Sequence, residues 1–217
     1  MNKHLQNFYN AICLADIAPI FSNYTRTDER DKEITESMAM LDAAINYSGF
    51  DKKDNSVQVF VVGDGKRPRT GILFAYFTSW NVRSIDPLMD YNWWDHYYEF
   101  KAKEGQIPKR IKVYNSMIED YEFPHRVLDY ESNNKLLILP HSHASMETCL
   151  DKLGTCTVIN MPCCKKFPDK LQSREAVAQY GYTNFMDFDV LSAKKTIHIW
   201  KGLNIKGYNE LTKKRKK

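Results

Sequence analysis

The sequence lacks the long apolar segments that mark secreted or membrane-spanning proteins. Its apolar runs are strand-sized, and its first 16 residues hold no long apolar run after a basic start. The five cysteines are odd in number and form no Cys-x-x-Cys pair, which argues against a disulfide framework and against a standard zinc site. We therefore expect an intracellular, cytoplasmic protein with no membrane partner and no bound metal.

The sequence also lacks a large excess of positive or negative charge. The chain has 31 Lys and Arg residues against 27 Asp and Glu residues, and residues 213–217 alone read Lys-Lys-Arg-Lys-Lys. Outside this tail the chain is close to neutral, so composition does not predict a nucleic-acid-binding protein. We expect the tail to be solvated, and to act as a nuclear address if the host is a eukaryote.

Strands and helices alternate along the 217 residues, which are enough for one sizeable domain. This alternation predicts an α/β fold: a Rossmann-like, mostly parallel sheet with helices on both faces and an antiparallel terminal hairpin. We divide the chain into an N-terminal helical extension (1–50), an α/β domain (51–207) and a basic tail (208–217). Strands are expected at 57–62, 82–85, 110–114, 135–139 and 157–161, helices at 68–77, 144–153 and 173–180, a loop at 22–31, and the hairpin at 188–191 with 196–200.

One block, residues 57–87, is typical of a nucleotide-type βαβ unit. An apolar strand stops at Gly63-Asp64-Gly65, a helix opened by Pro68 follows, and a second strand ends at Asp86. Glycines allow a ligand to approach the backbone, the helix start offers N–H groups, and a carboxylate at the next strand end suits a ribose diol. A tight turn without a ligand explains the glycines equally well.

The carboxyl ends of the predicted parallel strands hold most of the polar candidates. Ligands of such sheets bind beyond these ends, at the crossover point. One pocket is therefore predicted to draw on several strand ends, namely Gly63 to Gly65, Asp86, the loop 115–120, the loop 140–143 and the segment 162–164.

Over residues 55–201, these strand ends resemble the Rossmann-like S-adenosylmethionine-dependent methyltransferases. The resemblance implies S-adenosylmethionine as cofactor and methyl transfer as activity. It implies that a glycine loop, a ribose-binding acid and an adenine-contacting loop form the cofactor site, here Gly63, Asp64, Gly65, Arg69, Asp86, Pro87 and Met117. A weaker likeness, to a subgroup with Pro-Cys-Cys after strand five, rests on Pro162-Cys163-Cys164.

The candidate catalytic residues are His141, His143 and Cys163. Histidine after strand four can take a proton from a nitrogen or hydroxyl nucleophile. Cysteine after strand five can attack a pyrimidine ring if its pKa is lowered, which Lys165 and Lys166 would favour. The alternatives are histidines that only bond the loop backbone and a cysteine that is merely buried.

The glycine loop departs from the family pattern because Lys66, Arg67 and Arg69 follow it. Cations oppose the positive end of a helix dipole, so this placement favours a bound anion. We therefore expect an RNA or other nucleotide-containing substrate, with a solvated basic turn as the alternative. Two other functions stay open: a non-catalytic binding protein with a nucleotide or protein partner, and an enzyme that uses the fold with a phosphate-bearing ligand.

Overall fold

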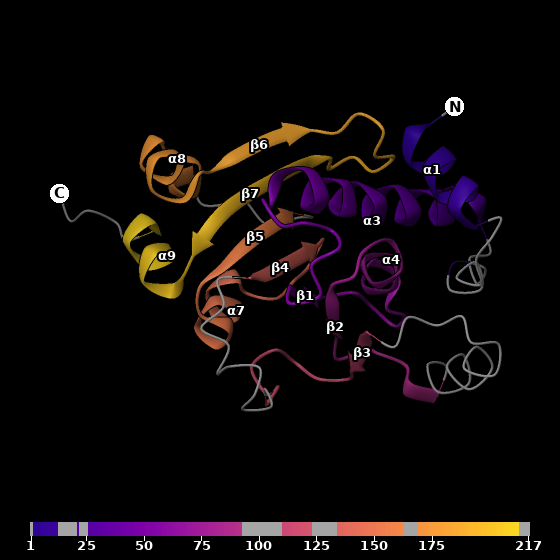
Figure 1. Cartoon of the computed structure of the whole chain (residues 1–217), viewed down its shortest axis with the longest axis horizontal. Coiled ribbons are helices and arrows are strands. Elements are labelled where there is room, and N and C mark those ends of the chain that lie inside the picture. The colour runs from indigo at the N-terminus through magenta and orange to yellow at the C-terminus, as the bar shows by residue number, and fades with distance from the viewer. Residues whose placement is uncertain are drawn as a thin grey trace.

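A seven-stranded sheet forms the centre of the molecule (Figure 1). The computed structural model describes residues 2–12, 21, 26–92, 110–122, 134–162 and 169–212. The strand order is β3-β2-β1-β4-β5-β7-β6; the first five strands are parallel, and β7 runs antiparallel to both β5 and β6. This confirms the predicted fold class. The strands are β1 Gln58–Val62, β2 Asn81–Ile85, β3 Ile111–Tyr114, β4 Lys135–Pro140, β5 Cys156–Met161, β6 Thr183–Met186 and β7 Thr196–Leu203.

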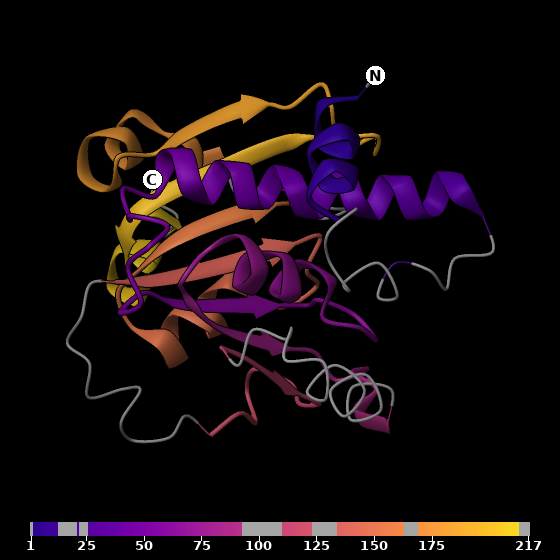
Figure 2. The same ribbon diagram turned by 45° about the vertical axis from the view of Figure 1, so that its right-hand side comes forward.

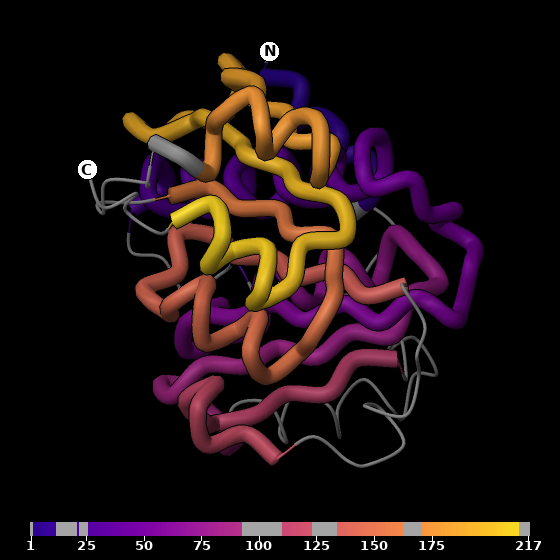
Figure 3. The backbone as a smooth tube through the Cα atoms, turned by 90° about the vertical axis from the view of Figure 1, so that its left-hand side faces the viewer, coloured from indigo at the N-terminus to yellow at the C-terminus, as the bar shows by residue number. Residues whose placement is uncertain are grey.

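Helices cover both faces of the sheet, and alternate residues of each central strand serve the two cores. Val59 and Val61 of β1 pack with one set of helices, whereas Phe60 and Val62 pack with the other. Figure 2 shows the arrangement in an oblique view, and Figure 3 shows it from one end of the molecule. The first set is α1 Lys3–Ile12, α3 Thr27–Tyr47 and α4 Arg69–Phe77; the second is α7 Met146–Leu153, the 3-10 helix η1 Asp169–Gln172, α8 Arg174–Tyr180 and α9 Ile205–Thr212.

The long helix α3 belongs to the main core, because its residues 34–41 are all buried. The loop predicted over 22–31 is wrong from Thr27 onward, where α3 already begins. Its first turn contains Asp28 and Glu29, which favour a helix start through the helix dipole. In sequence, such a charged, solvent-facing first turn has no apolar periodicity and is easily taken for a loop.

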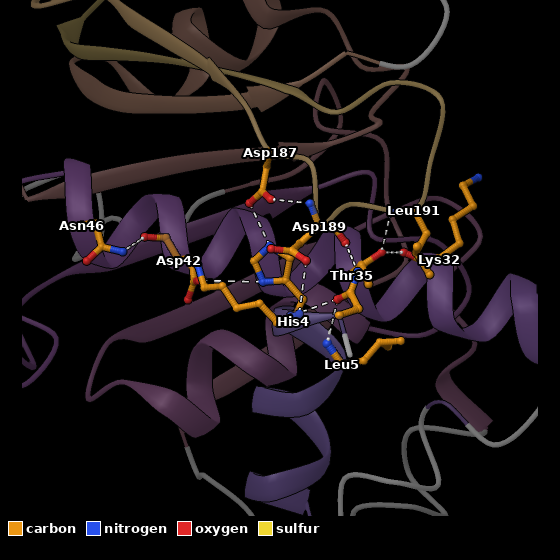
Figure 4. Close-up of polar contacts among 11 residues, drawn as sticks. His4, Leu5, Lys32, Thr35, Asp42, Asn46, Asp187, Asp189 and Leu191 are labelled. Atoms are coloured by element: carbon orange, nitrogen blue, oxygen red, sulfur yellow. Dashed lines mark hydrogen bonds and ion pairs between the residues drawn. The ribbon is translucent and has the colours of Figure 1, made fainter.

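The buried His4 side chain connects α1 with the loop that follows the edge strand β6 (Figure 4). The Nε2 atom of His4 lies 2.8 Å from Asp187 Oδ2, and its Nδ1 atom lies 3.7 Å from Asp42 Oδ2 on α3. In addition, the Leu191 N–H donates to the Thr35 hydroxyl of α3 at 3.1 Å. These contacts hold α3 against the loop between β6 and β7. They thereby also fix the position of the α3 side chains on the opposite side of the helix.

The terminal hairpin exists, but its first strand is not the predicted one. Strand β6 ends at Met186, and Phe188, which the prediction placed in a strand, is 78% exposed in a turn. The edge strand β6 is exposed along most of its length, so it lacks the apolar alternation by which half-buried strands are recognised.

Helix α9 was not predicted, and it runs to Thr212 through residues assigned to the basic tail. Residues 213–217, like Cys163, Cys164, Lys165 and Lys166, lie outside the described part of the chain. Of the helices that the structure describes, none combines the length and apolarity that a bilayer crossing requires.

Candidate functional site

The glycine turn after β1 has a backbone that only glycine adopts readily. Gly63 and Gly65 have φ angles of +85° and +80°, in the region that L side chains rarely occupy. A Cβ atom added to Gly63 would lie 2.5 Å from Ser142 Oγ and 2.8 Å from Ser142 Cβ. The loop after β4 therefore sits directly on the glycine turn, as the convergence of strand ends predicts.

The Asp64 carboxyl group points into the protein. It accepts hydrogen bonds from the Thr70 and Gly71 N–H groups at 2.9 Å each and from the Ser84 hydroxyl at 2.7 Å. Burial raises the pKa of Asp64, and these hydrogen bonds act in the opposite direction. The side chain predicted to bind the cofactor thus caps α4 and ties it to β2, which favours a structural role.

Asp86 lies directly after β2, and its carboxylate is hydrogen-bonded to the glycine turn. Its Oδ2 atom accepts from the Gly65 N–H at 2.9 Å, and its Oδ1 atom accepts from the Leu88 N–H at 2.7 Å. The residue is only 7% exposed. Because each carboxylate oxygen can accept more than one hydrogen bond, Asp86 retains acceptor capacity for hydroxyl groups of a ligand.

An apolar cavity of about 430 Å³ opens beside Asp86. Two other predicted cofactor residues, Pro87 and Met117, line it, and Met117 and Leu88 are 47% and 63% exposed. The loop after β3 is held in place because the Asn115 N–H donates to the Tyr91 hydroxyl at 2.8 Å. The cavity is within the size range of small-molecule sites and combines apolar walls with one convergent acid.

A polar cavity of about 340 Å³ lies on the other side of the glycine turn. Both cavities are lined by Gly63, His141 and His143, so the two candidate histidines stand where the cavities meet. The polar cavity also holds the predicted Arg69, together with three charged residues of α3: Lys32, Glu33 and Glu36.

His141 has a strained backbone and an unusual side-chain partner. Its φ angle is +51°, and no other non-glycine residue among those described has a positive φ. Its Nε2 atom lies 3.0 Å from Glu36 Oε1, yet both buried atoms lack a hydrogen bond of normal geometry. Strain of this kind costs about 1–3 kcal/mol and is concentrated at functional sites, which marks His141 as the stronger of the two histidine candidates.

The environment of Glu33 in the polar cavity can be tested through the pH dependence of protein stability. Burial raises the pKa of Glu33, the neighbouring Glu36 raises it further, and Arg69, Lys32 and His141 lower it. A carboxyl group whose pKa is raised in the folded state stabilises the fold at low pH and loses that contribution as pH rises from about 4.5 through the folded pKa.

We therefore expect Glu33→Gln to be more stable relative to the wild type at pH 7 than at pH 4, in urea unfolding at the two pH values. Glu29→Gln is the control, because the Glu29 side chain is 52% exposed on the same helix. A relative loss of stability at pH 7 for Glu33→Gln would contradict the assigned environment.

The basic residues after the turn do not create a free anion site at the start of α4. The Thr70 and Gly71 N–H groups already bond the Asp64 carboxyl group. A phosphate at this helix start would have to displace that buried group. Arg69, for its part, lines the polar cavity with Glu33 and Glu36.

Several other sequence candidates fall outside the site. Cys163 lies outside the described residues, so its role stays a prediction. The described cysteines, Cys149 and Cys156, are buried, and burial raises the pKa of each thiol to about 12, so neither suits a thiolate role. Within the described ranges, no three His, Cys, Asp or Glu side chains gather as a metal site would require.

Sequence reasoning missed Glu33 and Glu36. The only local signal was an acid, Glu36, inside a stretch of α3 that is otherwise suited to burial. Acids are rarely buried without a partner.

No family model and no curated protein sequence matches the chain. Solved structures with a similar fold include the 16S rRNA (adenine(1408)-N(1))-methyltransferase from Catenulisporales acidiphilia, at 14% identity over 68% of this chain and 89% of that chain, with a TM-score of 0.44. A SAM-dependent methyltransferase from Aquifex aeolicus matches at 13% identity over 81% and 98%, with a TM-score of 0.43. The human methyltransferase 10 domain containing protein matches at 13% identity over 76% and 81%, with a TM-score of 0.47. These are distant likenesses.

Proposed function

We propose that the protein is an S-adenosylmethionine-dependent methyltransferase. The main support is Asp86, whose carboxylate holds the Gly65 N–H at 2.9 Å and lines the apolar cavity of about 430 Å³. An acid with spare acceptor capacity suits a ribose diol, and the apolar walls near Met117 suit an adenine ring. The residues that line the cavity therefore fit the cofactor that the sequence resemblance implies.

The junction of the two cavities is the proposed place of reaction. When bound, the cofactor supplies a methyl group on a positively charged sulfur. Gly63, His141 and His143 border both cavities, so an imidazole there can accept the proton that a nitrogen or hydroxyl nucleophile loses. Arg69 and the backbone of the glycine turn remain the candidates for the amino-acid end of the cofactor.

Calorimetry with a defined ligand panel tests this function. We expect binding of S-adenosylmethionine and S-adenosylhomocysteine, and none of ATP or NAD. Binding of phosphate compounds alone, abolished by Arg69→Ala, would instead support an enzyme with a phosphate-bearing ligand. Failure of every small molecule to bind would support a non-catalytic protein with a protein partner.

Asp86→Ala should weaken S-adenosylhomocysteine binding by about 1–3 kcal/mol, roughly 5- to 150-fold in Kd, because two hydroxyls lose a charged acceptor. The variant also removes the partner of the Gly65 and Leu88 N–H groups, so a collapsed turn must be distinguished from a lost ligand contact. S-adenosylhomocysteine without its two ribose hydroxyls makes that distinction. Wild type should bind this analogue weakly, and Asp86→Ala should bind both compounds alike. A tenfold preference for the hydroxylated compound in the variant would contradict the assignment.

An RNA or nucleotide-containing acceptor has limited support. It rests on Lys66, Arg67, Arg69 and the tail, of which the tail lies outside the described residues. Phosphate binding at the start of α4 is opposed by Asp64, as described above.

A further inference from the structure

His141 is held from two directions at the junction of the two cavities. Its backbone N–H donates to the Met161 carbonyl of β5 at 3.0 Å, and the next residue, Ser142, rests on the glycine turn. Its ring lies against α3, where the Nε2 atom is 3.0 Å from Glu36 Oε1. The backbone and the ring are thus fixed by different elements, which is the arrangement that a precisely oriented functional side chain needs.

The two ring nitrogens of His141 have different environments. The Nε2 atom is buried against Glu36, although the side chain as a whole is 20% exposed. Among the described residues, none is hydrogen-bonded to the Nδ1 atom, which is not enclosed as Nε2 is. Because His141 lines both cavities, the ring nitrogen that a ligand there can reach is Nδ1.

Glu36 is placed to keep the imidazole proton on the buried nitrogen. A carboxylate accepts hydrogen bonds and cannot donate them, so the ring nitrogen beside it is the one that carries the proton. A neutral imidazole then has its lone pair on the other nitrogen. The contact is short but is not aligned with the N–H direction, which is common for catalytic pairs before a substrate binds.

Lys32 supports Glu36 without replacing His141 as its partner. The Lys32 Nζ atom is 3.7 Å from Glu36 Oε1, and the Lys32 side chain is 47% exposed, so this ion pair is weak. His141 approaches the same oxygen more closely and in a buried place. The remaining charged groups of the polar cavity are Glu33 and Arg69, apart from Asp64 and His143. Lys32 therefore favours the carboxylate form of Glu36, and the buried imidazole receives the oriented contact.

We propose that Glu36 is a positioning residue that holds the Nε2–H group of His141, so that Nδ1 is the atom which takes the proton from the methyl acceptor. The transfer step rests on the proposed methyltransferase function, whereas the orientation of the ring does not. The strained backbone of His141 fits this role, because it directs the ring toward α3 while the loop stays on the glycine turn.

The proton and electron pairs balance without any further reactant. The proton of the acceptor's N–H or O–H group passes to Nδ1, and Glu36, which stays ionised, stabilises the resulting imidazolium. The freed electron pair of the acceptor forms a bond to the methyl carbon, and the carbon–sulfur bond breaks with its electron pair going to sulfur. The products are the methylated acceptor and S-adenosylhomocysteine, and Nδ1 then releases its proton to water.

A small methylating reagent tests which nitrogen is available. The whole chain, with isotopically labelled histidine, is treated with methyl 4-nitrobenzenesulfonate at about pH 8.5, above the usual titration range of histidine. The lone pair of the attacked nitrogen bonds the methyl carbon while the sulfonate leaves, so the ring gains a positive charge as it does on proton uptake. We expect His141 to be methylated at Nδ1, as located by NMR and peptide mass spectrometry.

Variants of α3 then test the part that Glu36 has in this reactivity. Glu36→Gln should slow methylation of His141 at least about tenfold, because the imidazolium loses a charged partner. Glu29→Gln, exposed on the same helix, and Lys32→Met should react like the wild type. Rates are compared with that of His143 in the same sample, and a purely structural role of Glu36 would change the unfolding midpoint but not the relative rate.

Each outcome decides one of the two proposals. Methylation at Nε2, no reaction at His141, or equal rates for wild type and Glu36→Gln would overturn the role of Glu36. If Glu36→Gln does not fold, the NMR shifts of the unmodified wild type decide, because a proton on Nδ1 and none on Nε2 refutes the assigned orientation. Methylation at Nδ1 in a protein that does not bind S-adenosylhomocysteine in calorimetry refutes the methyltransferase function and leaves the orientation standing.

Discussion

Asp64→Ala should destabilise the fold by about 3–5 kcal/mol in urea unfolding. The variant leaves two N–H groups of α4 and the Ser84 hydroxyl without their acceptor, in a place where water has little access. Loss of a helix cap costs about 1 kcal/mol, and each buried donor left unpaired costs about 1–3 kcal/mol. Such a change is a large fraction of the stability of a typical domain.

Asp51→Ala is the matched control for this variant. The Asp51 carboxylate accepts one hydrogen bond, from the exposed Lys53 N–H at 2.9 Å, which water can replace, so a loss within about 0.5–1 kcal/mol is expected. If Asp64→Ala instead unfolds like wild type but binds S-adenosylhomocysteine weakly, the side chain acts on the ligand. That result would support the role that the glycine motif suggested and contradict the one that its hydrogen bonds indicate.

The sheet was largely predictable because its central strands are buried on both faces. Such strands read as short continuous apolar runs, and here each run ends at a glycine, an acid or a proline. Strand β6 and the start of α3 were not predictable in this way. One is an exposed edge and the other is a charged, solvent-facing turn, so neither has an apolar pattern for local reasoning to detect.

The residues of the candidate site also fall into two groups, those that local sequence patterns could place and those that only long-range packing could place. Asp86, Pro87, Met117 and His141 follow strand ends directly, so a correct strand places each of them at the same sheet edge. The direction of the Asp64 side chain depends on where Ser84 and α4 pack, which the glycine pattern does not encode. Glu33 and Glu36 reach the site only because α3 packs across the sheet, a long-range arrangement held in part by His4 and Thr35.

The contact between Gly63 and Ser142 is the junction on which both cavities depend. Gly63→Ala should destabilise the protein by about 3–5 kcal/mol and weaken S-adenosylhomocysteine binding. The new Cβ atom would meet Ser142 at 2.5–3.0 Å, including the Ser142 Cα atom, which cannot rotate away. Steric strain at a positive φ adds about 1–3 kcal/mol to an overpacking cost of about the same size.

Gly65→Ala isolates the steric contact from the backbone strain. Its φ of +80° is similar, but the nearest atom to an added Cβ is Arg69 Nη1 at 4.0 Å. Gly65→Ala should therefore cost only the strain, and the difference between the two variants measures how firmly the loop after β4 sits on the turn. In the Gly63→Ala background, Ser142→Gly should restore part of the lost stability by removing Oγ and Cβ. Equal unfolding midpoints for the two alanine variants would mean that this loop does not rest on Gly63, and the two cavities would then not share the wall that the proposed methyl transfer requires.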